Sequence, residues 1–203
     1  AFWGVSHSRP TVMSGLMSAH PPAVRCSFSA TSTTSQGGST LHAETVVPSN
    51  AGCGLTNGPD GKLYSNTSGG VAVLDASTGA AVSMGGQAGN ALGIAYDPAT
   101  RRLVYPDQAC GFTSVGCPID TYDPASGAST TLLTIPASQA TFIDGVAFDP
   151  SGRFLLLSTR YPVFALTVVD TQTARIVQQV PIGSEPDGIS VHWSSPQFVV
   201  TSN

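Results

Sequence analysis

The chain has 203 residues, and only 10% of them are charged, whereas about 25% is usual in soluble domains. Eight Lys and Arg residues stand against twelve Asp and Glu, and Lys62 is the only lysine. A basic surface that could neutralise the phosphates of nucleic acid is therefore excluded as a main feature. The longest apolar runs, such as residues 164–169, are much shorter than the roughly 20 residues of a membrane-spanning helix, so we predict no membrane span.

The N-terminal region differs from the rest of the chain. The first residue is Ala1 rather than Met, as after removal of a signal peptide, so we expect an extracellular or periplasmic, that is secreted, protein. Residues 1–22 begin with a strand-like apolar segment and are predicted to be an extension of one domain, residues 23–203. Three roles stay open for the extension: packing on its own domain, pairing with a neighbouring copy, or belonging to a larger fold of which this chain is a fragment.

Four units of similar sequence follow, starting near residues 53, 92, 144 and 187. Each has a glycine followed by an apolar strand-like segment, and a second apolar run begins about ten residues later. The leading glycines are Gly54, Gly93, Gly145 and Gly188. A third run ends at an Asp that opens a short turn in three of the units, at Asp75, Asp123 and Asp170. An Asp in that place accepts hydrogen bonds from backbone N–H groups of the turn, which predicts a hairpin tip.

A fourth run then closes each complete unit, so we predict four short antiparallel strands a unit. The period is near the roughly 40 to 45 residues of a four-stranded propeller blade, and no long segment repeats apolar residues at helical spacing. The predicted fold class is all-β, a β-propeller of about four four-stranded blades. An all-β solenoid or sandwich is the alternative.

The best-defined unit resembles a known family. Residues 144–154 read Asp-Gly-Val-Ala-Phe-Asp-Pro-Ser-Gly-Arg-Phe, followed by Val-Val-Asp at 168–170 and Val-Pro-Ile-Gly at 180–183. This pattern resembles the YVTN-type repeat of secreted β-propellers and, more loosely, the lactonase-like propellers. The resemblance covers residues 53–203 and implies the propeller fold, but no single activity, because these repeats serve many functions. Such families usually have six or seven blades, more than this chain can form.

The last unit contains only two of its four strands, since its second strand lies at residues 198–203. Residues 23–30 and 40–48 are strand-like and are predicted to supply the third and fourth strands, so that the two ends of the chain share one blade. A neighbouring subunit could supply strands in the same way. Self-assembly into an oligomer or filament therefore remains open, and copies of the chain itself are the first expected partner.

The four cysteines are Cys26, Cys53, Cys110 and Cys117. An even number in an exported chain indicates two disulfides, although four cysteines permit three pairings. Cys110 and Cys117 enclose a short loop that contains glycine, so we expect them to pair, which leaves Cys26 with Cys53. Zinc binding is the competing hypothesis, but no Cys-x-x-Cys spacing occurs.

Two carboxylates occupy the same position of neighbouring units, because Asp144 and Asp187 each precede a leading glycine. In a propeller the innermost strand of every blade lines the central channel, so these two side chains could bind Ca²⁺ at the channel mouth. The alternative is that each Asp hydrogen-bonds its own turn. No other cofactor is expected. The metal ligands of lactonase-like propellers cannot be transferred, because Glu44, Glu185 and Asn57 do not fall at matching repeat positions.

Two further candidates concern carbohydrate. His192 and Trp193 stand together at the end of an inner strand and could bind a sugar or a peptide, although such a pair also packs as a simple rim. Asn66-Thr67-Ser68 is an N-glycosylation acceptor triplet on a predicted loop, which would make the chain a glycoprotein.

No common hydrolase or cofactor motif occurs in the sequence, which lowers the expectation of an enzyme without removing it. The predicted function is therefore a secreted, non-enzymatic binding or structural propeller that can assemble with itself. The first alternative is a metal-dependent, lactonase-like hydrolase that uses Asp144 and Asp187. The second is a carbohydrate-binding propeller.

Overall fold

The structure is a computed structural model, and it describes residues 27–32, 41–46, 54–75, 80–90, 92–110, 115–191 and 198–202. All the regular elements in these ranges are β-strands. They form three four-stranded antiparallel sheets and two two-stranded ones. The expectation of an all-β chain built from repeated four-stranded units is confirmed.

Each complete sheet uses four strands that follow one another in the sequence. The first sheet contains β3 (Leu55–Asn57), β4 (Leu63–Thr67), β5 (Gly70–Leu74) and β6 (Ala81–Gly85). The second contains β7 (Ala95–Asp97), β8 (Arg102–Pro106), β9 (Cys117–Tyr122) and β10 (Ser129–Ile135). The third contains β11 (Phe142–Phe148), β12 (Phe154–Arg160), β13 (Ala165–Asp170) and β14 (Arg175–Pro181).

The remaining strands form two hairpins. These are β15 (Pro186–Val191) with β16 (Phe198–Ser202), and β1 (Ser27–Ser32) with β2 (Leu41–Val46). The strands predicted near residues 23–30 and 40–48 therefore exist in part, and they pair with each other, as the third and fourth strands of one blade would. No strand pairing in the described ranges joins β16 to β1 or β2, so a blade shared by the two chain ends stays a prediction.

The predicted turns explain where the strands reverse. Asp123 Oδ1 accepts the backbone N–H of Ala125 at 2.8 Å, and Gly127 has the left-handed φ of 74° that closes this turn. Asp170 Oδ1 accepts the N–H of Gln172 at 2.9 Å in the corresponding turn of the third sheet. These carboxylates hold hairpin tips, as predicted.

The sheets stack face to face. Successive side chains of a strand point to opposite faces of its sheet, so one sheet can contribute to an apolar cluster on each side. Between the second and third sheets lies the largest cluster, which includes Val104, Ile119, Ile143 and Leu157. On the opposite face of the second sheet, Leu103 and Tyr105 pack with residues of the first sheet in another cluster. A sheet whose two faces both pack against neighbouring sheets is the arrangement of a propeller blade.

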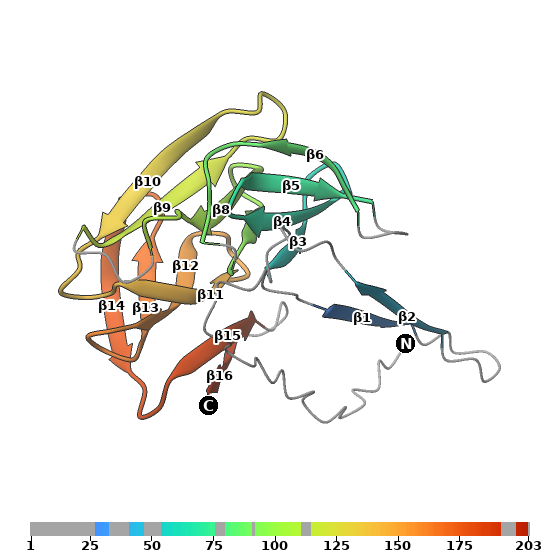
Figure 1. The fold of residues 1–203 in the computed structure, drawn as a ribbon. Coiled ribbons are helices and arrows are strands. Elements are labelled where there is room, and N and C mark those ends of the chain that lie inside the picture. Colours follow the sequence, from blue (N-terminus) through green and yellow to red (C-terminus); the bar gives the residue numbers. More distant parts are fainter. Residues whose placement is uncertain are drawn as a thin grey trace, which may run out of the picture.

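The sheets are arranged around a common centre, and the β15–β16 hairpin takes its place beside the third sheet (Figure 1). The first strand of each sheet is the one nearest this centre: β3 contacts β7, β7 contacts β11, and β11 contacts β15. The innermost strands are therefore the ones that contain the repeated glycine or closely follow it, and they position the candidate site.

Candidate functional site

The repeated glycines let the innermost strands approach one another. A Cβ atom on Gly93 would lie 2.5 Å from Cγ2 of Val146, and one on Gly145 would lie 2.9 Å from the carbonyl oxygen of Asp187. A Cβ atom on Gly54 would collide with the carbonyl of Leu92. Each of these glycines thus faces the start of the next unit, where there is no room for a side chain.

A central cavity of about 350 Å³ lies within this ring of strands. It is lined by the three residues that follow the leading glycine in every unit: 55–57, 94–96, 146–148 and 189–191. The lining is mainly aliphatic, with Thr56, Asn57, Tyr96 and Ser190 as its polar members. The innermost strands therefore line a central channel, as the repeat predicts.

Polar side chains opposite two of the glycines connect neighbouring units. Ser158 accepts the N–H of Gly145 at 2.6 Å and donates to the carbonyl of Asp187 at 2.7 Å. Asn66 Nδ2 donates to the carbonyl of Gly93 and to Oδ1 of Asn90, both at 3.0 Å. These bonds join the first sheet to the second and the third sheet to β15.

This position does not suit a glycan on Asn66. The side chain is fully buried on β4, and its amide nitrogen, the atom that a glycan would occupy, already donates two hydrogen bonds. The loop predicted around the acceptor triplet is in fact the end of a strand. Glycosylation at Asn66 stays a prediction, and it would require this side chain to leave its buried position.

Asp144 and Asp187 come together near the start of β11 and β15. The guanidinium of Arg160, the last residue of β12, lies between their carboxylates and pairs with both. Arg160 pairs through Nε with Asp144 and through Nη1 with Glu185, and its Nη2 lies 2.5 Å from Oδ1 of Asp187. Its Nε also donates to the carbonyl of Pro186 at 3.2 Å. We call Arg160, Asp144, Glu185 and Asp187 the Arg160 cluster.

The electrostatics of the cluster are dominated by three carboxylates around one guanidinium. Burial raises the pKa of Asp144 to about 7; Arg160 lowers it, and the charges of Asp187 and Glu185 raise it. The Asp144 side chain is 12% exposed and that of Asp187 38%. Asp144 is therefore the member whose charge is most costly in this site.

Binding of Ca²⁺ by Asp144 and Asp187 stays a prediction, and the arrangement fits an ion-pair brace better. A metal would need the space between the two carboxylates, which the Arg160 guanidinium fills. Within the ranges that the structure describes, no group of three or more His, Cys, Asp or Glu side chains has the geometry of a metal site.

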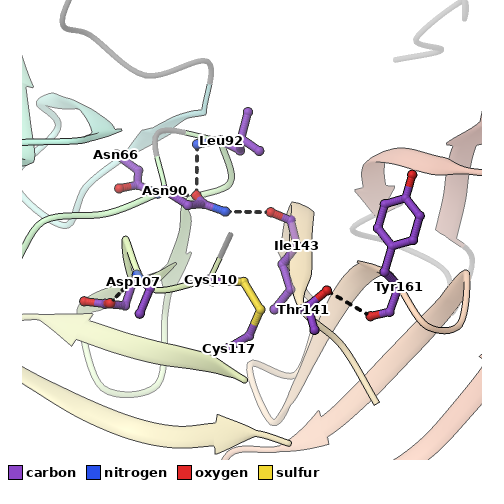
Figure 2. Close-up of a disulfide and its surroundings, with 10 residues drawn as sticks. Asn66, Asn90, Leu92, Asp107, Cys110, Cys117, Thr141, Ile143 and Tyr161 are labelled. Carbon is purple, nitrogen blue, oxygen red and sulfur yellow. Dashed lines mark hydrogen bonds between the residues drawn. A yellow bond between two sulfur atoms is a disulfide. The ribbon is translucent and has the colours of Figure 1, made fainter. Parts of the chain in front are cut away.

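The disulfide between Cys110 and Cys117 is present as predicted. Both cysteines are fully buried in the apolar cluster between the second and third sheets. Figure 2 shows the sulfur atoms beside Ile143, whose carbonyl accepts a hydrogen bond of 2.7 Å from Asn90 Nδ2. The bridge therefore fastens the β8–β9 connection onto the interface between two sheets.

The other predicted site residues lie outside the described residues. These are His192, Trp193, Cys26 and Cys53. The sugar-binding hypothesis for His192 and Trp193 and the second disulfide therefore stay predictions. In the part of the chain that the structure covers, no helix is long and apolar enough to cross a membrane.

Comparison with known proteins supports the fold. The chain resembles the crystal structure of the β-propeller domain of Myceliophteria thermophila Cps50 (Swd1), with a TM-score of 0.52 and 15% sequence identity. The match covers 80% of this chain and 57% of the other, so this chain spans little more than half of that domain's length. No protein-family model matches the sequence, and no curated protein matches it either. The stacked sheets, the central ring and this likeness define the class: the protein is a β-propeller. Identity this low shows the fold alone.

Proposed function

We propose that this protein is a secreted, non-enzymatic β-propeller that serves as a binding or structural module and assembles with copies of itself. The observation that carries the proposal is the unequal strand count around the ring. Three positions hold four-stranded sheets, whereas β15 and β16 stand as a pair, and β16 has no strand partner except β15 among the described strands. An exposed strand edge is a template for a further strand.

The β1–β2 hairpin offers two strands that could add to the free edge of β16. In the described ranges this hairpin pairs with no other strand. If the hairpin of one copy added to β16 of another, the result would be a four-stranded blade made by two chains. Repetition of this contact around a closed or open path would give a ring or a filament.

Secretion is supported by the Cys110–Cys117 disulfide, because disulfides persist mainly in oxidising compartments. The repeat that resembles the YVTN type of secreted propeller points the same way, and we keep that affiliation as part of the proposal. The low content of charged residues also suits a surface made largely of Ser, Thr and Gly.

The assembly state of the native protein tests the proposal, by mass photometry and negative-stain electron microscopy. We expect species larger than the 20.7 kDa chain, and fewer of them after Val199→Lys, because Lys protects a strand edge from pairing. Val199 is 63% exposed on β16. Val177→Lys is the matched control, since Val177 is 53% exposed on β14, the outer strand of a complete sheet. A native protein found only as monomers would remove self-assembly from the proposal, and equal loss of the larger species in both variants would overturn the assignment of the contact to the β16 edge.

The hydrolase alternative makes a different prediction. It requires a bound metal and turnover of a lactone, both lost in the double variant Asp144→Asn, Asp187→Asn. Metal analysis of the purified protein, together with a lactone hydrolysis assay, separates it from the binding module.

A further inference from the structure

A groove of about 400 Å³ lies between the second and third sheets, at the end of the molecule where the β7–β8, β11–β12 and β13–β14 turns meet. This volume is within the range of sites for small ligands, about 300 to 1,000 Å³. The groove is separate from the central cavity, because the two share no lining residue. It is also formed entirely by residues that the structure describes.

Two arginines line the groove, one from each sheet. Arg102 begins β8, and Arg153 immediately precedes β12, so they occupy equivalent positions of two repeats. Arg153 is already engaged, since its Nε and Nη2 donate to Oδ2 of Asp170 at 3.2 and 2.7 Å. Arg102 is exposed, and its charge adds to side-chain hydrogen bonding in lowering the pKa of Asp123, but no carboxylate within the described ranges lies at ion-pair distance from it. The groove thus contains one guanidinium whose donors can meet an anion.

Hydroxyl groups form much of the remaining lining, and several of them donate their hydrogen to another group of the protein. Thr100 donates to Asp97 at 2.6 Å, Ser151 donates to Asp149 at 2.6 Å, and Thr171 donates to the carbonyl of Arg153 at 2.9 Å. A hydroxyl that has given its hydrogen away still has lone pairs to accept with. The groove therefore offers several acceptors close to one cationic donor.

An apolar side chain completes the lining. The register of β9 and β10 shifts between Thr131 and Leu133, so the intervening Leu132 belongs to a β-bulge. Leu132 lines the groove and is half-buried there. A pyranose ring has apolar C–H faces, hydroxyl donors at its edge and, in a uronic acid, a carboxylate. Each of these groups has a matching partner in the groove.

We infer that this groove binds an acidic saccharide, with the uronate carboxylate on Arg102 and sugar hydroxyls donating to Thr100, Ser151 and Thr171. The inference rests on the proposed function, because it names acidic saccharides as the class of ligand that the binding module takes. It differs from a sugar site at His192 and Trp193 in its place and in its requirement for negative charge.

Isothermal titration calorimetry with digalacturonate tests the inference, with uncharged digalactose as the matched ligand. We expect digalacturonate to bind the native protein. Its affinity for the Arg102→Gln variant should be at least tenfold lower, and its affinity for the Arg175→Gln variant should be unchanged. Arg175 is an exposed arginine at the start of β14 and does not line the groove. Equal binding of digalactose, or equal loss in both variants, would overturn the assignment of Arg102 as the carboxylate partner.

Two further outcomes would also overturn the inference. These are binding of a Glu-rich hexapeptide without any binding of digalacturonate, and absence of binding by all three probes. Each protein is checked for an unchanged melting temperature and for its assembly state. Normal assembly without saccharide binding would remove the groove proposal and leave the proposed function intact. Saccharide binding by a protein that is always a monomer would keep the groove proposal and remove self-assembly from the proposed function.

Discussion

Nη2 of Arg160 lies 2.5 Å from Oδ1 of Asp187, and this contact joins the last residue of β12 to the second residue of β15. The same guanidinium also pairs with Asp144 on β11 and with Glu185 before β15. Arg160 therefore connects the complete third sheet to the two-stranded hairpin that follows it. It is also the one positive charge among three negative ones in the cluster.

We predict that Arg160→Met destabilises the protein by about 3–5 kcal/mol, because it leaves partly buried carboxylates without their cation. Met keeps an apolar stem over Phe142, whose ring centroid is 5.5 Å from the guanidinium carbon. Asp144→Asn should lower the free energy of unfolding much less, because Arg160 would keep its ion pairs with Glu185 and Asp187. Urea unfolding of the two variants and the native protein measures both values. A cost for Asp144→Asn equal to that of Arg160→Met would contradict these unequal roles of the two residues.

The pKa of Asp144 gives a second prediction. Burial raises it from 3.8 to about 7, so between these values the folded state binds more protons than the unfolded state. The contribution of Asp144 to the free energy of unfolding is therefore greatest below pH 4 and falls as the pH rises to about 7.

Melting temperatures of the native protein and of Asp144→Asn from pH 4.5 to 8 measure this effect. We expect the stability of Asp144→Asn relative to the native protein to rise with pH and to level off above pH 7. The comparison cancels the contribution of Asp120, whose pKa burial also raises. Asp60, Asp123, Asp149 and Asp170 have lowered pKa values, so their contributions are lost mainly below this pH range. A difference that does not vary with pH would show that Asp144 titrates normally.

The repeated glycine gives a third prediction, for which the chain has a matched control. Gly93→Ala should destabilise the protein by roughly 1–3 kcal/mol, because the new Cβ would lie 2.5 Å from Val146 Cγ2 and 2.7 Å from the carbonyl oxygen of Asp144. Gly183→Ala should change stability by no more than about 0.5 kcal/mol, since a Cβ there meets nothing within 4 Å. Thermal unfolding compares the two. Equal effects would show that close approach is not why glycine occupies position 93.

These glycines also explain how much of the fold could be predicted from the sequence. A glycine required by a close approach recurs wherever the approach recurs, so Gly54, Gly93 and Gly145 revealed the repeat and the innermost strands. The turns were equally predictable, because Asp123 and Asp170 bond to backbone groups two residues away. Local chemistry of this kind is visible in one sequence.

The candidate site was predictable only in part. The repeat placed Asp144 and Asp187 in neighbouring units, but it gave no sign of Arg160 or Glu185. Arg160 ends β12 at a point where β4 ends in Thr67 and β8 in Pro106, so the signal that could have found it is a difference between the units and not their repeat. The burial of Asn66 was missed because a polar triplet indicates a loop, whereas here a contact with the next unit buries the strand end.

The disulfide gives the last prediction. Cys110 and Cys117 are seven residues apart, and closing so short a loop in the unfolded chain is worth about 2.5 kcal/mol in the chain-entropy model. We expect the double variant Cys110→Ser, Cys117→Ser to lose at least this much, because two hydroxyls would also replace sulfur atoms in an apolar cluster. The matching variant Cys110→Ala, Cys117→Ala has no such polar groups and should lose less. Urea unfolding of both variants, with and without reductant for the native protein, separates the two causes. A native protein whose stability is unaffected by complete reduction would show that the bridge adds nothing to the fold.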